Sequence, residues 1–347
     1  MTSERKPRLV MHAGTHKTGT TAIQRFACMN RNRLLELGWL YPDYGPVRRV
    51  DNESHLDFAH ALAGEPSPLR SRSIPKVLRT WKNVALEHNS TTLISAEAFW
   101  RHVDRSVNGS WIQKREAFLS AAANALSDFS VNAIVVLRSH EDLARSSYKE
   151  TVRRGLDAGK LTFPNFVRER SMRALRYADN LDAFARCFDD VSVALYSELS
   201  HHGSIVEGFC THVGVPYQSM KSVGRVRPSL TIPETIVKRY MNDVCCCSND
   251  ERLNYLYGDE CQALIRRWFT FEEDLWAGHE EREKALRRWQ RDAENVRDRW
   301  FPKYREIFPH GSCGDLVSYA LPREIRDGIE AWDKSCMTTR QTRGISQ

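Results

Sequence analysis

The amino-acid sequence predicts an α/β protein in which helices cover both faces of a parallel β-sheet. Up to about residue 235, short apolar runs alternate with longer amphipathic stretches, as in consecutive βαβ units. We expect strands at 8–13, 91–95, 132–137 and 191–196. We expect helices at 19–37, 112–128, 141–154, 178–187 and 204–214. A glycine-bracketed turn between the first strand and the first helix supports this fold class, because open α/β sheets often bind nucleotides at such turns.

Two departures from this alternation set the expected domain organisation. Residues 41–80 are rich in Pro, Arg and Ser, so we expect a long loop or an insertion there. From about residue 236 the chain is dense in Arg, Glu and Trp at helical spacing. We therefore expect an α/β core over 1–235 and a helical C-terminal extension packed on it over 236–335. The polar end, 336–347, is expected to be a flexible tail.

Composition and charge limit the classes of function. The 347-residue chain is 41% hydrophobic and 27% charged, which is ordinary for a soluble globular protein. Its net charge of +7 suits a polyanionic cofactor or an anionic glycan, and would also suit nucleic acid. We see no signal peptide and no membrane-spanning run. The nine cysteines show no metal-binding spacing, and Cys245, Cys246 and Cys247 are consecutive. We therefore expect a cytoplasmic protein with reduced thiols and no metal.

The turn after the first strand is the most informative segment, and it reads Gly14-Thr-His-Lys-Thr-Gly-Thr-Thr21. A strand, a glycine-rich turn and a helix together form a cradle for phosphate. The Walker pattern places lysine directly after the second glycine, whereas Thr20 follows Gly19 here and the lysine is Lys17, inside the turn. We therefore predict a P-loop NTPase-like three-layer sandwich with a central parallel sheet and a helical C-terminal extension. Its expected ligand carries one 5′-phosphate and a leaving group, without metal.

Two blocks of the sequence resemble a known family. His12-x-Gly14-Thr-His-Lys-Thr-Gly-Thr-Thr21 resembles the 5′-phosphosulfate loop of the sulfotransferases that use 3′-phosphoadenosine-5′-phosphosulfate (PAPS), in its bacterial form. The block after residue 134 resembles the family's 3′-phosphate site, with Arg138 at a strand end and Ser146 eight positions later. The resemblance covers residues 8–40 and 91–215 and fades after about residue 235. It implies a P-loop-like sulfotransferase fold, PAPS as the donor and 3′,5′-adenosine bisphosphate as the product.

The resemblance also implies roles for individual residues. Lys17 would stabilise charge on the leaving oxygen, and Arg138 with Ser146 would bind the 3′-phosphate. A basic turn at 223–230 resembles a late loop of the family that closes over this phosphate, and it contributes Arg227. The implied cofactor-binding residues are His16, Lys17, Thr18, Gly19, Thr20, Thr21, Arg138, Ser146 and Arg227. Both His12 and His16 flank the turn and are expected to shape it or to contact phosphosulfate oxygens.

Two residues are candidates for the base that activates the acceptor. Glu97 directly follows the expected strand at 91–95, at the edge where open α/β sheets bind ligands. Its stretch resembles the strand-end Ser-Ser-Glu string of the bacterial family, with Ala96 in place of the second serine. His55 is the alternative, since histidine is the commonest general base. Either residue could instead be structural, Glu97 as a helix cap or an ion-pair partner and His55 as a packed side chain.

The predicted function is therefore transfer of a sulfuryl group from PAPS to an acceptor hydroxyl or amine. A carbohydrate or another small metabolite is the expected acceptor, with no nucleic-acid partner. One alternative is a kinase-like P-loop phosphotransferase, although the missing lysine after the second glycine disfavours it. A second alternative is a basic binding module that keeps the fold without catalysis. The sequence gives no indication of the oligomeric state.

Overall fold

The computed structural model of the chain divides it into two compact units. The structure describes residues 5–15, 18–47, 52–156, 161–169, 173–218, 220–224, 229–269, 273–309, 315–316 and 318–342. The first unit comprises Met1–Ser139, Arg173–Val226 and Asp292–Phe308. The second comprises His140–Met172, Arg227–Arg291 and Pro309–Gln347. Both units are discontinuous in sequence, and the continuous core and extension expected on either side of residue 235 stay a prediction.

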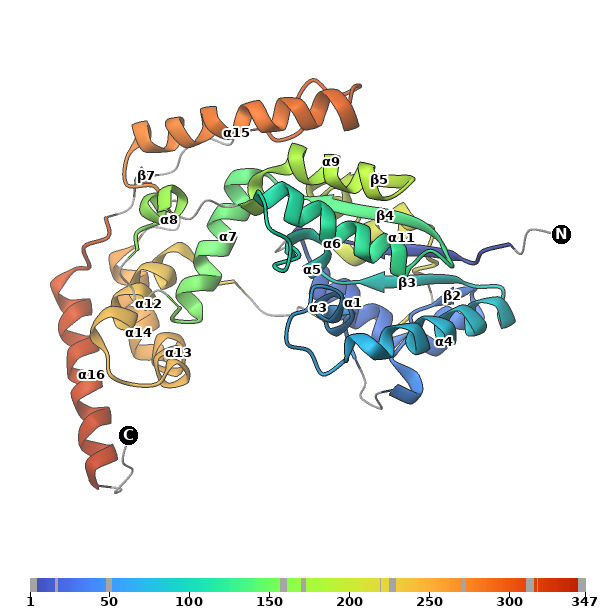
Figure 1. Cartoon of the computed structure of the whole chain (residues 1–347). Helices are drawn as coiled ribbons and strands as arrows, with labels where there is room; N and C mark the ends of the chain where they lie inside the picture. The colour runs from blue at the N-terminus through green and yellow to red at the C-terminus, as the bar shows by residue number, and fades with distance from the viewer. Residues whose placement is uncertain are drawn as a thin grey trace. The chain divides into compact units, whose positions relative to one another are not determined.

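A five-stranded sheet forms the centre of the first unit (Figure 1). Its strands are β1 (Arg8–His12), β2 (Trp39–Leu40), β3 (Thr91–Ser95), β4 (Ser130–Leu137) and β5 (Asp190–Leu195). They lie in the order β2-β3-β1-β4-β5, and every neighbouring pair is parallel. The α/β fold class with a central parallel sheet is therefore confirmed. All five strands end at the same edge, so the segments that follow them can meet there.

One face of the sheet packs against the helices that follow β1 and β5. These are α1 (Thr20–Met29), α2 (Arg31–Glu36), α10 (Tyr196–Ser200) and α11 (Ile205–Val213). Val10 and Leu93 from the strands share a buried core with Phe26 and Phe209 from the helices. The single helix expected at 19–37 is divided at Asn30, whose side chain and backbone both donate hydrogen bonds to the carbonyl oxygen of Phe26 (2.8 and 3.2 Å).

The alternate strand residues, among them Leu9, Met11 and Val135, are buried on the opposite face. Five helices belong to this side: α3 (Leu56–Leu62), α4 (Ile74–Glu87), α5 (Ala98–Arg101), α6 (Trp111–Ala125) and α9 (Tyr177–Cys187). Arg115 is fully buried among them and donates hydrogen bonds to Asn180 Oδ1 (3.0 Å) and to the carbonyl oxygens of residues 99 and 102. Its charge is therefore accommodated by oxygen acceptors inside the core.

The segment 41–80, where we expected a long loop or an insertion, contains regular helices, and its being an insertion stays a prediction. It contains α3, the first half of α4 and short 3₁₀ turns at Gly45–Val47 and Ser71–Ser73. The helix α4 buries Val77, Leu78 and Trp81. The indole N–H of Trp81 donates a hydrogen bond to the carbonyl oxygen of Asp43 (2.6 Å). This bond holds the segment that leads into the turn Gly45–Val47 against α4. A helical spacing of apolar residues is thus present within this Pro- and Arg-rich composition.

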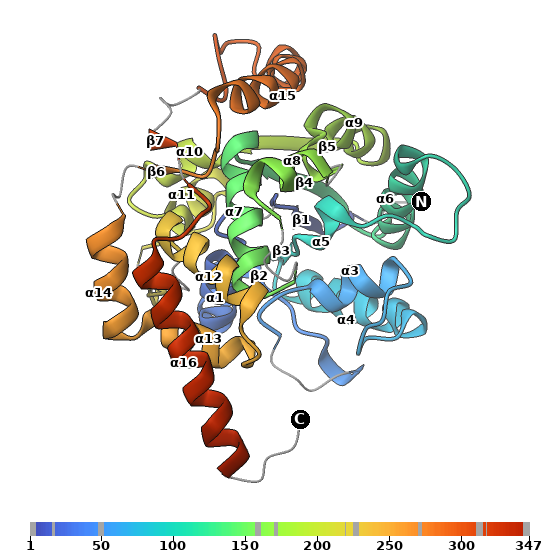
Figure 2. The same cartoon turned by 90° about the vertical axis from the view of Figure 1, so that its left-hand side faces the viewer.

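The second unit is mostly helical (Figure 2). It contains α7 (His140–Arg153), α8 (Phe163–Glu169), α12 (Ile232–Val244), α13 (Asn249–Tyr257), α14 (Asp259–Trp268), α16 (Arg323–Thr342) and the first part of α15 (His279–Trp300). A small parallel pair, β6 (Glu273–Asp274) and β7 (Asp315–Leu316), completes it. The expected helical C-terminal region is confirmed. The helix α16 continues to Thr342, beyond residue 336 where we expected a flexible tail to begin.

A buried ionic network holds α7, the helix that carries Ser146, within the second unit. The Glu141 carboxylate accepts hydrogen bonds from Trp276 Nε1 (2.8 Å), Arg282 Nε (2.9 Å) and an Arg145 guanidinium nitrogen (2.7 Å). Burial acts to raise the pKa of Glu141, but the hydrogen bond from Arg282 and the charge of Arg145 lower it to about 2. Glu141 is therefore ionised at neutral pH and joins α7 to α15 and to the segment after β6.

Candidate functional site

The turn after β1 is held along the neighbouring strand β4. The backbone N–H groups of Ala13 and Thr15 donate to the carbonyl oxygens of Ile134 (2.8 Å) and Val136 (3.0 Å). The Thr15 hydroxyl also donates to Val136 O (3.1 Å), and the Thr18 hydroxyl donates back to Thr15 O (2.6 Å). These bonds fix Thr15 and Thr18 at the edge where the strands end. The site residues His16 and Lys17 lie outside the described residues.

The two glycines of the turn are needed for its packing. A Cβ atom at Gly14 would meet the hydroxyl oxygens of Thr18 and Thr20 at 2.7 Å each. Gly19 has φ +74°, in the left-handed region that disfavours other residues, and a Cβ there would lie 2.7 Å from the side chain of Ile205. The threonine hydroxyls thus close over Gly14, while Gly19 turns the chain into α1 against the start of α11.

The N-terminus of α1 offers a site for an anion. The helix begins at Thr20, and its N-cap residue Gly19 provides no side-chain hydrogen bond to the first turn. The first backbone N–H groups of a helix have no partner within the helix, and the helix dipole places partial positive charge there. The first turn contains no acidic residue, and Thr21 is exposed. A phosphate or sulfate group is the ligand that such a helix start favours.

His12 supplies a second and independent sign of a ligand at this turn. Its Nδ1 lies 2.9 Å from Ser95 Oγ, which also accepts a hydrogen bond from Gln24 Nε2 (3.2 Å). The Ser95 hydroxyl can then donate to Nδ1, and this favours the His12 tautomer with its proton on Nε2. That nitrogen is buried without a hydrogen-bond partner among the described residues, and it faces Gly14.

The protonation of His12 fits this role as a donor. Burial lowers the pKa of His12 to about 4, although the nearby Glu97 carboxylate acts to raise it. The ring is therefore neutral at physiological pH, with one N–H directed at the turn. A buried N–H without an acceptor is costly, and an oxygen of a bound anion would satisfy it. The sequence placed His12 beside the turn but could not show which ring nitrogen faces it.

Glu97 lies at the same edge of the sheet, one strand away. Ser95 is paired with His12 in the register of β1 and β3, and the N–H of Ala96 donates to His12 O (3.1 Å). Glu97 follows as the N-cap residue of α5, is partly exposed, and is close enough for its charge to act on the His12 ring. The carboxylate predicted as the base is thus brought to the vicinity of the turn.

His55 has a different environment from the one that a base requires. Its Nε2 donates to Pro42 O (3.0 Å), and its Nδ1 accepts the backbone N–H of Ser95 (3.1 Å). The side chain is fully buried, and mainly this burial lowers the pKa of His55 to about 3. Both ring nitrogens are used to connect two distant backbone segments. The geometry therefore favours a structural role, and Glu97 remains as our candidate base.

The two buried histidines are expected to make the fold sensitive to acid. Their folded-state pKa values, about 4 for His12 and about 3 for His55, lie below the unfolded value near 6.5, so the unfolded chain binds protons more readily. The free energy of unfolding should therefore be greatest above pH 6.5 and fall as the pH drops, by about 1.4 kcal/mol per pH unit for each histidine. Denaturant unfolding at pH 7 and pH 5 measures this. His55→Gln should be less stable at pH 7 with a shallower pH dependence, and an unchanged pH dependence would contradict the structural role.

Arg138 directly follows β4, at the same edge of the sheet as the turn. Its carbonyl oxygen accepts a hydrogen bond from Tyr177 OH (2.7 Å), and its guanidinium carbon lies 5.0 Å from the centre of the Tyr196 ring, just after β5. Ser146 is partly buried on α7, in the second unit. Their joint contact with a 3′-phosphate stays a prediction, as does the role of Arg227, which is outside the described residues.

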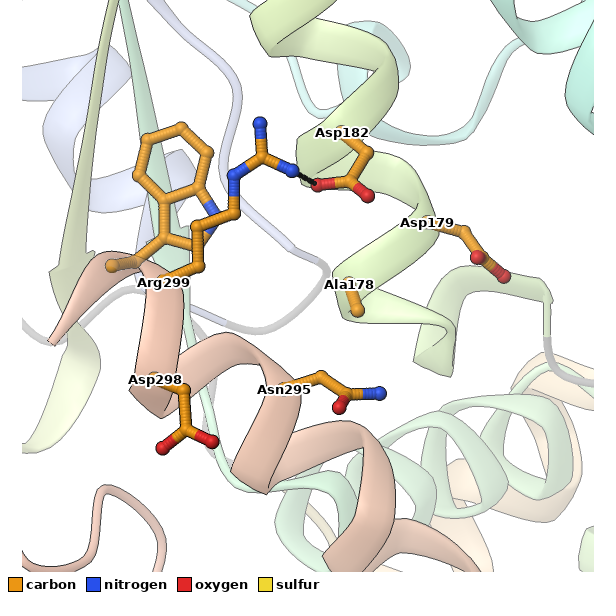
Figure 3. Close-up of a pocket in the computed structure, with 7 residues that line it drawn as sticks. Ala178, Asp179, Asp182, Asn295, Asp298 and Arg299 are labelled. Carbon is orange, nitrogen blue, oxygen red and sulfur yellow. Dashed lines mark hydrogen bonds and ion pairs between the residues drawn. The ribbon is translucent and has the colours of Figure 1, made fainter. Parts of the chain in front are cut away.

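A cavity elsewhere in the first unit is lined by acidic side chains and is a poor candidate for binding an anion. Its volume is about 450 Å³, and Asp179, Asp182 and Asp298 lie on its wall. Figure 3 shows Asp182 paired with Arg299. The other two aspartates form ion pairs with arginines close in sequence. Each of the three carboxylates is thus balanced by an arginine, and the Arg299 guanidinium on this wall is itself paired with Asp182, which makes the wall a poor site for a phosphate.

The described parts of the chain contain no group of three or more His, Cys, Asp or Glu side chains that could hold a metal ion. Within the same residues, no helix is both long and apolar enough to span a membrane. The predicted independence from metal stays a prediction, to be tested by cofactor binding.

Comparisons with known proteins give a likeness to solved structures and nothing from sequence. No family model matches the sequence, and no curated protein matches it. Among solved structures, the chain is similar to a sulfotransferase from Alicyclobacillus acidocaldarius, with 15% sequence identity and a TM-score of 0.37. The match covers 73% of this chain and 96% of that one. A likeness at this level does not assign a function, so the proposal below depends on the residues of the turn and its neighbours.

Proposed function

We propose that the protein transfers a sulfuryl group from PAPS to a hydroxyl or amine group of a carbohydrate or another small metabolite. The observation that carries the proposal is the turn after β1, where α1 begins at Thr20 and the buried Nε2 of His12, which has no hydrogen-bond partner among the described residues, lies against Gly14. Both features call for an anion. In the sequence, Lys17 precedes Gly19 and Thr20 follows it, whereas a triphosphate-binding loop has its lysine directly after the second glycine. The order found here resembles the phosphosulfate loop, and this supports a phosphosulfate ligand over a triphosphate.

The residues of the turn fit a 5′-phosphosulfate group. Backbone N–H groups at Thr20 and Thr21 and the Nε2–H of His12 would donate hydrogen bonds to its oxygens. Bound PAPS supplies the activated sulfuryl group. Lys17 would stabilise negative charge on the bridging oxygen, and Glu97 would accept the proton of the attacking acceptor. Thr15 and Thr18 are already held by hydrogen bonds, so these two residues need little reorganisation on binding.

The 3′-phosphate would be bound on the β4 side of β1, whereas Glu97 lies on the β3 side. Arg138 follows the neighbouring strand β4, and Tyr196 beneath its guanidinium group restricts the orientation of that group. A planar guanidinium can donate two hydrogen bonds to one phosphate. Ser146 and Arg227 are proposed as further contacts. A kinase-like phosphotransferase or a basic binding module needs no site for a 3′-phosphate. The preference of the protein among nucleotides therefore distinguishes these two functions from sulfuryl transfer.

Calorimetric titration with 3′,5′-adenosine bisphosphate, ADP, and ATP with magnesium tests the proposal. We expect the bisphosphate to bind most tightly, and Arg138→Ala to weaken it by about 10- to 100-fold through loss of charged hydrogen bonds. Arg8→Ala is the matched control, because Arg8 is exposed at the opposite end of β1. Tighter binding of ATP with magnesium would overturn the proposal in favour of a phosphotransferase, and equal binding of all three would favour a binding module.

A further inference from the structure

Two cysteines from distant segments lie near the same carboxylate in the second unit, and the thiol of one of them contacts it. Cys247 lies between α12 and α13 and is buried. Its thiol donates a hydrogen bond to Asp333 Oδ1 on α16 (3.0 Å), and the backbone N–H of Cys246 lies 3.4 Å from Asp333 Oδ2. Cys336 follows Asp333 by three positions on α16, so the two side chains project from the same face of that helix.

The thiols of Cys247 and Cys336 are close enough to interact directly. A hydrogen bond between them contributes to the raised pKa of Cys247, after burial and the hydrogen bond to Asp333. Cys336 is partly exposed, whereas Cys247 is buried, so solvent reaches the pair from the α16 side. Reagents in solution would therefore meet Cys336 first.

The helices on either side of Cys247, α12 and α13, both pack against the part of α16 that precedes Cys336. Tyr240 OH on α12 donates to Glu330 Oε1 (3.1 Å), one turn before Asp333. The rings of Tyr255 on α13 and Trp332 stack with centres 4.4 Å apart at an angle of 20°. Figure 2 shows α16 running alongside α12 and α13. The backbone segments that carry the two thiols are thus fixed relative to each other.

We propose that Cys247 and Cys336 form a reversible disulfide bond, with a small-molecule disulfide as the oxidant. The Cys336 thiolate attacks the small-molecule disulfide, forms a mixed disulfide and releases one small thiolate. Cys247 then attacks the Cys336 sulfur, its proton passes to the Asp333 carboxylate, and the second small thiolate leaves; both released thiolates take up protons from solvent. The two protein thiols together lose two electrons, which reduce the small disulfide to two thiols.

The environment of Cys247 suits the second step. Burial and Asp333 keep it as a thiol, and therefore unreactive, until Cys336 carries a leaving group beside it. The same carboxylate is then in place to accept its proton at 3.0 Å. The bond would join α16 to the connection between α12 and α13. This inference is independent of the proposed sulfuryl transfer.

Treatment of the full-length protein with oxidised glutathione tests the inference, followed by alkylation and non-reducing peptide mass spectrometry. The wild type should lose two thiols relative to the untreated protein and yield a Cys247–Cys336 cross-linked peptide that disappears in dithiothreitol. Cys247→Ser should instead retain glutathione on Cys336. Cys246→Ser is the matched control, since Cys246 is the exposed neighbour, and it should still form the bond.

Two results would overturn the inference. One is persistent glutathione on Cys336 of the wild type without a cross-linked peptide. The other is a cross-link from Cys336 to Cys246 in place of Cys247. Because the wild-type protein alone gives either result, the test does not depend on the folding of a variant.

Discussion

Replacing Lys17 with alanine is expected to lower the turnover of sulfuryl transfer by about 10²- to 10³-fold, the usual effect of removing a group that stabilises developing charge. Transfer of the sulfuryl group leaves negative charge on the 5′-phosphate, and Lys17 is the cation within the turn. Binding of 3′,5′-adenosine bisphosphate should change much less, because Arg138 and the start of α1 are untouched. Steady-state turnover with PAPS, together with calorimetric binding of the bisphosphate, measures both effects.

Lys6→Ala is the matched control for Lys17→Ala. Lys6 is exposed and precedes β1, so it lies at the opposite edge of the sheet from the turn. We expect the turnover of this variant to equal that of the wild type. If Lys17→Ala also kept wild-type turnover, the proposed mechanism would be wrong. If it lost turnover and bisphosphate binding together, Lys17 would act in binding and the stabilisation of the leaving group would need another residue.

The sheet could be predicted from sequence because its strands are buried on both faces. Central parallel strands appear as continuous apolar runs. The strands expected at 91–95 and 132–137 correspond to β3 (Thr91–Ser95) and β4 (Ser130–Leu137). The shortest strand, β2 (Trp39–Leu40), was missed because two residues carry no periodic signal.

The helices within 41–80 were missed for a different reason. Pro, Arg and Ser dominate the composition there, and they concealed the spacing of Val77, Leu78 and Trp81 on the buried face of α4. Position 30 illustrates the same limit at a single residue. Asn30 ends α1 through hydrogen bonds to Phe26 O, and it also contacts the backbone of Lys221 (2.9 and 3.0 Å), far along the chain. Such a tertiary contact cannot be read from local propensity.

Sequence indicated the turn and Glu97 because both belong to short contiguous motifs. The sequence could not show whether His55 is a general base or a structural residue. The structural role of His55 depends on hydrogen bonds with Pro42 and Ser95, which lie in other segments. The unsatisfied Nε2 of His12 and the approach of Cys247 to Cys336 likewise depend on residues brought together only by folding. Sequence motifs therefore indicate where a candidate site lies. The hydrogen bonding and protonation of each side chain depend on the residues that folding brings next to it.

Glu97→Gln is expected to lower turnover by about 10²- to 10⁴-fold, the range for loss of a general base. The amide keeps the size of the side chain but cannot accept the proton of the acceptor. The affinity for 3′,5′-adenosine bisphosphate should stay close to that of the wild type, because Glu97 follows β3, whereas the turn follows β1 and Arg138 follows β4. The acidic limb of the pH–rate profile, which reports protonation of the base, should also disappear. Turnover across pH and calorimetric binding provide the measurements.

The control Glu87→Gln removes a carboxylate of the same kind from the other end of β3. Glu87 is exposed at the end of α4, just before that strand begins, and its loss should leave turnover unchanged. Because Glu97 acts on the pKa of His12, the amide could also disturb the turn itself, and the binding measurement distinguishes the two effects. Collapse of bisphosphate affinity in Glu97→Gln would show that the carboxylate maintains the anion site. If turnover and the acidic limb of the pH–rate profile were lost while bisphosphate affinity stayed intact, Glu97 would be the base that accepts the proton of the acceptor. Only loss of the base changes the pH dependence in that way.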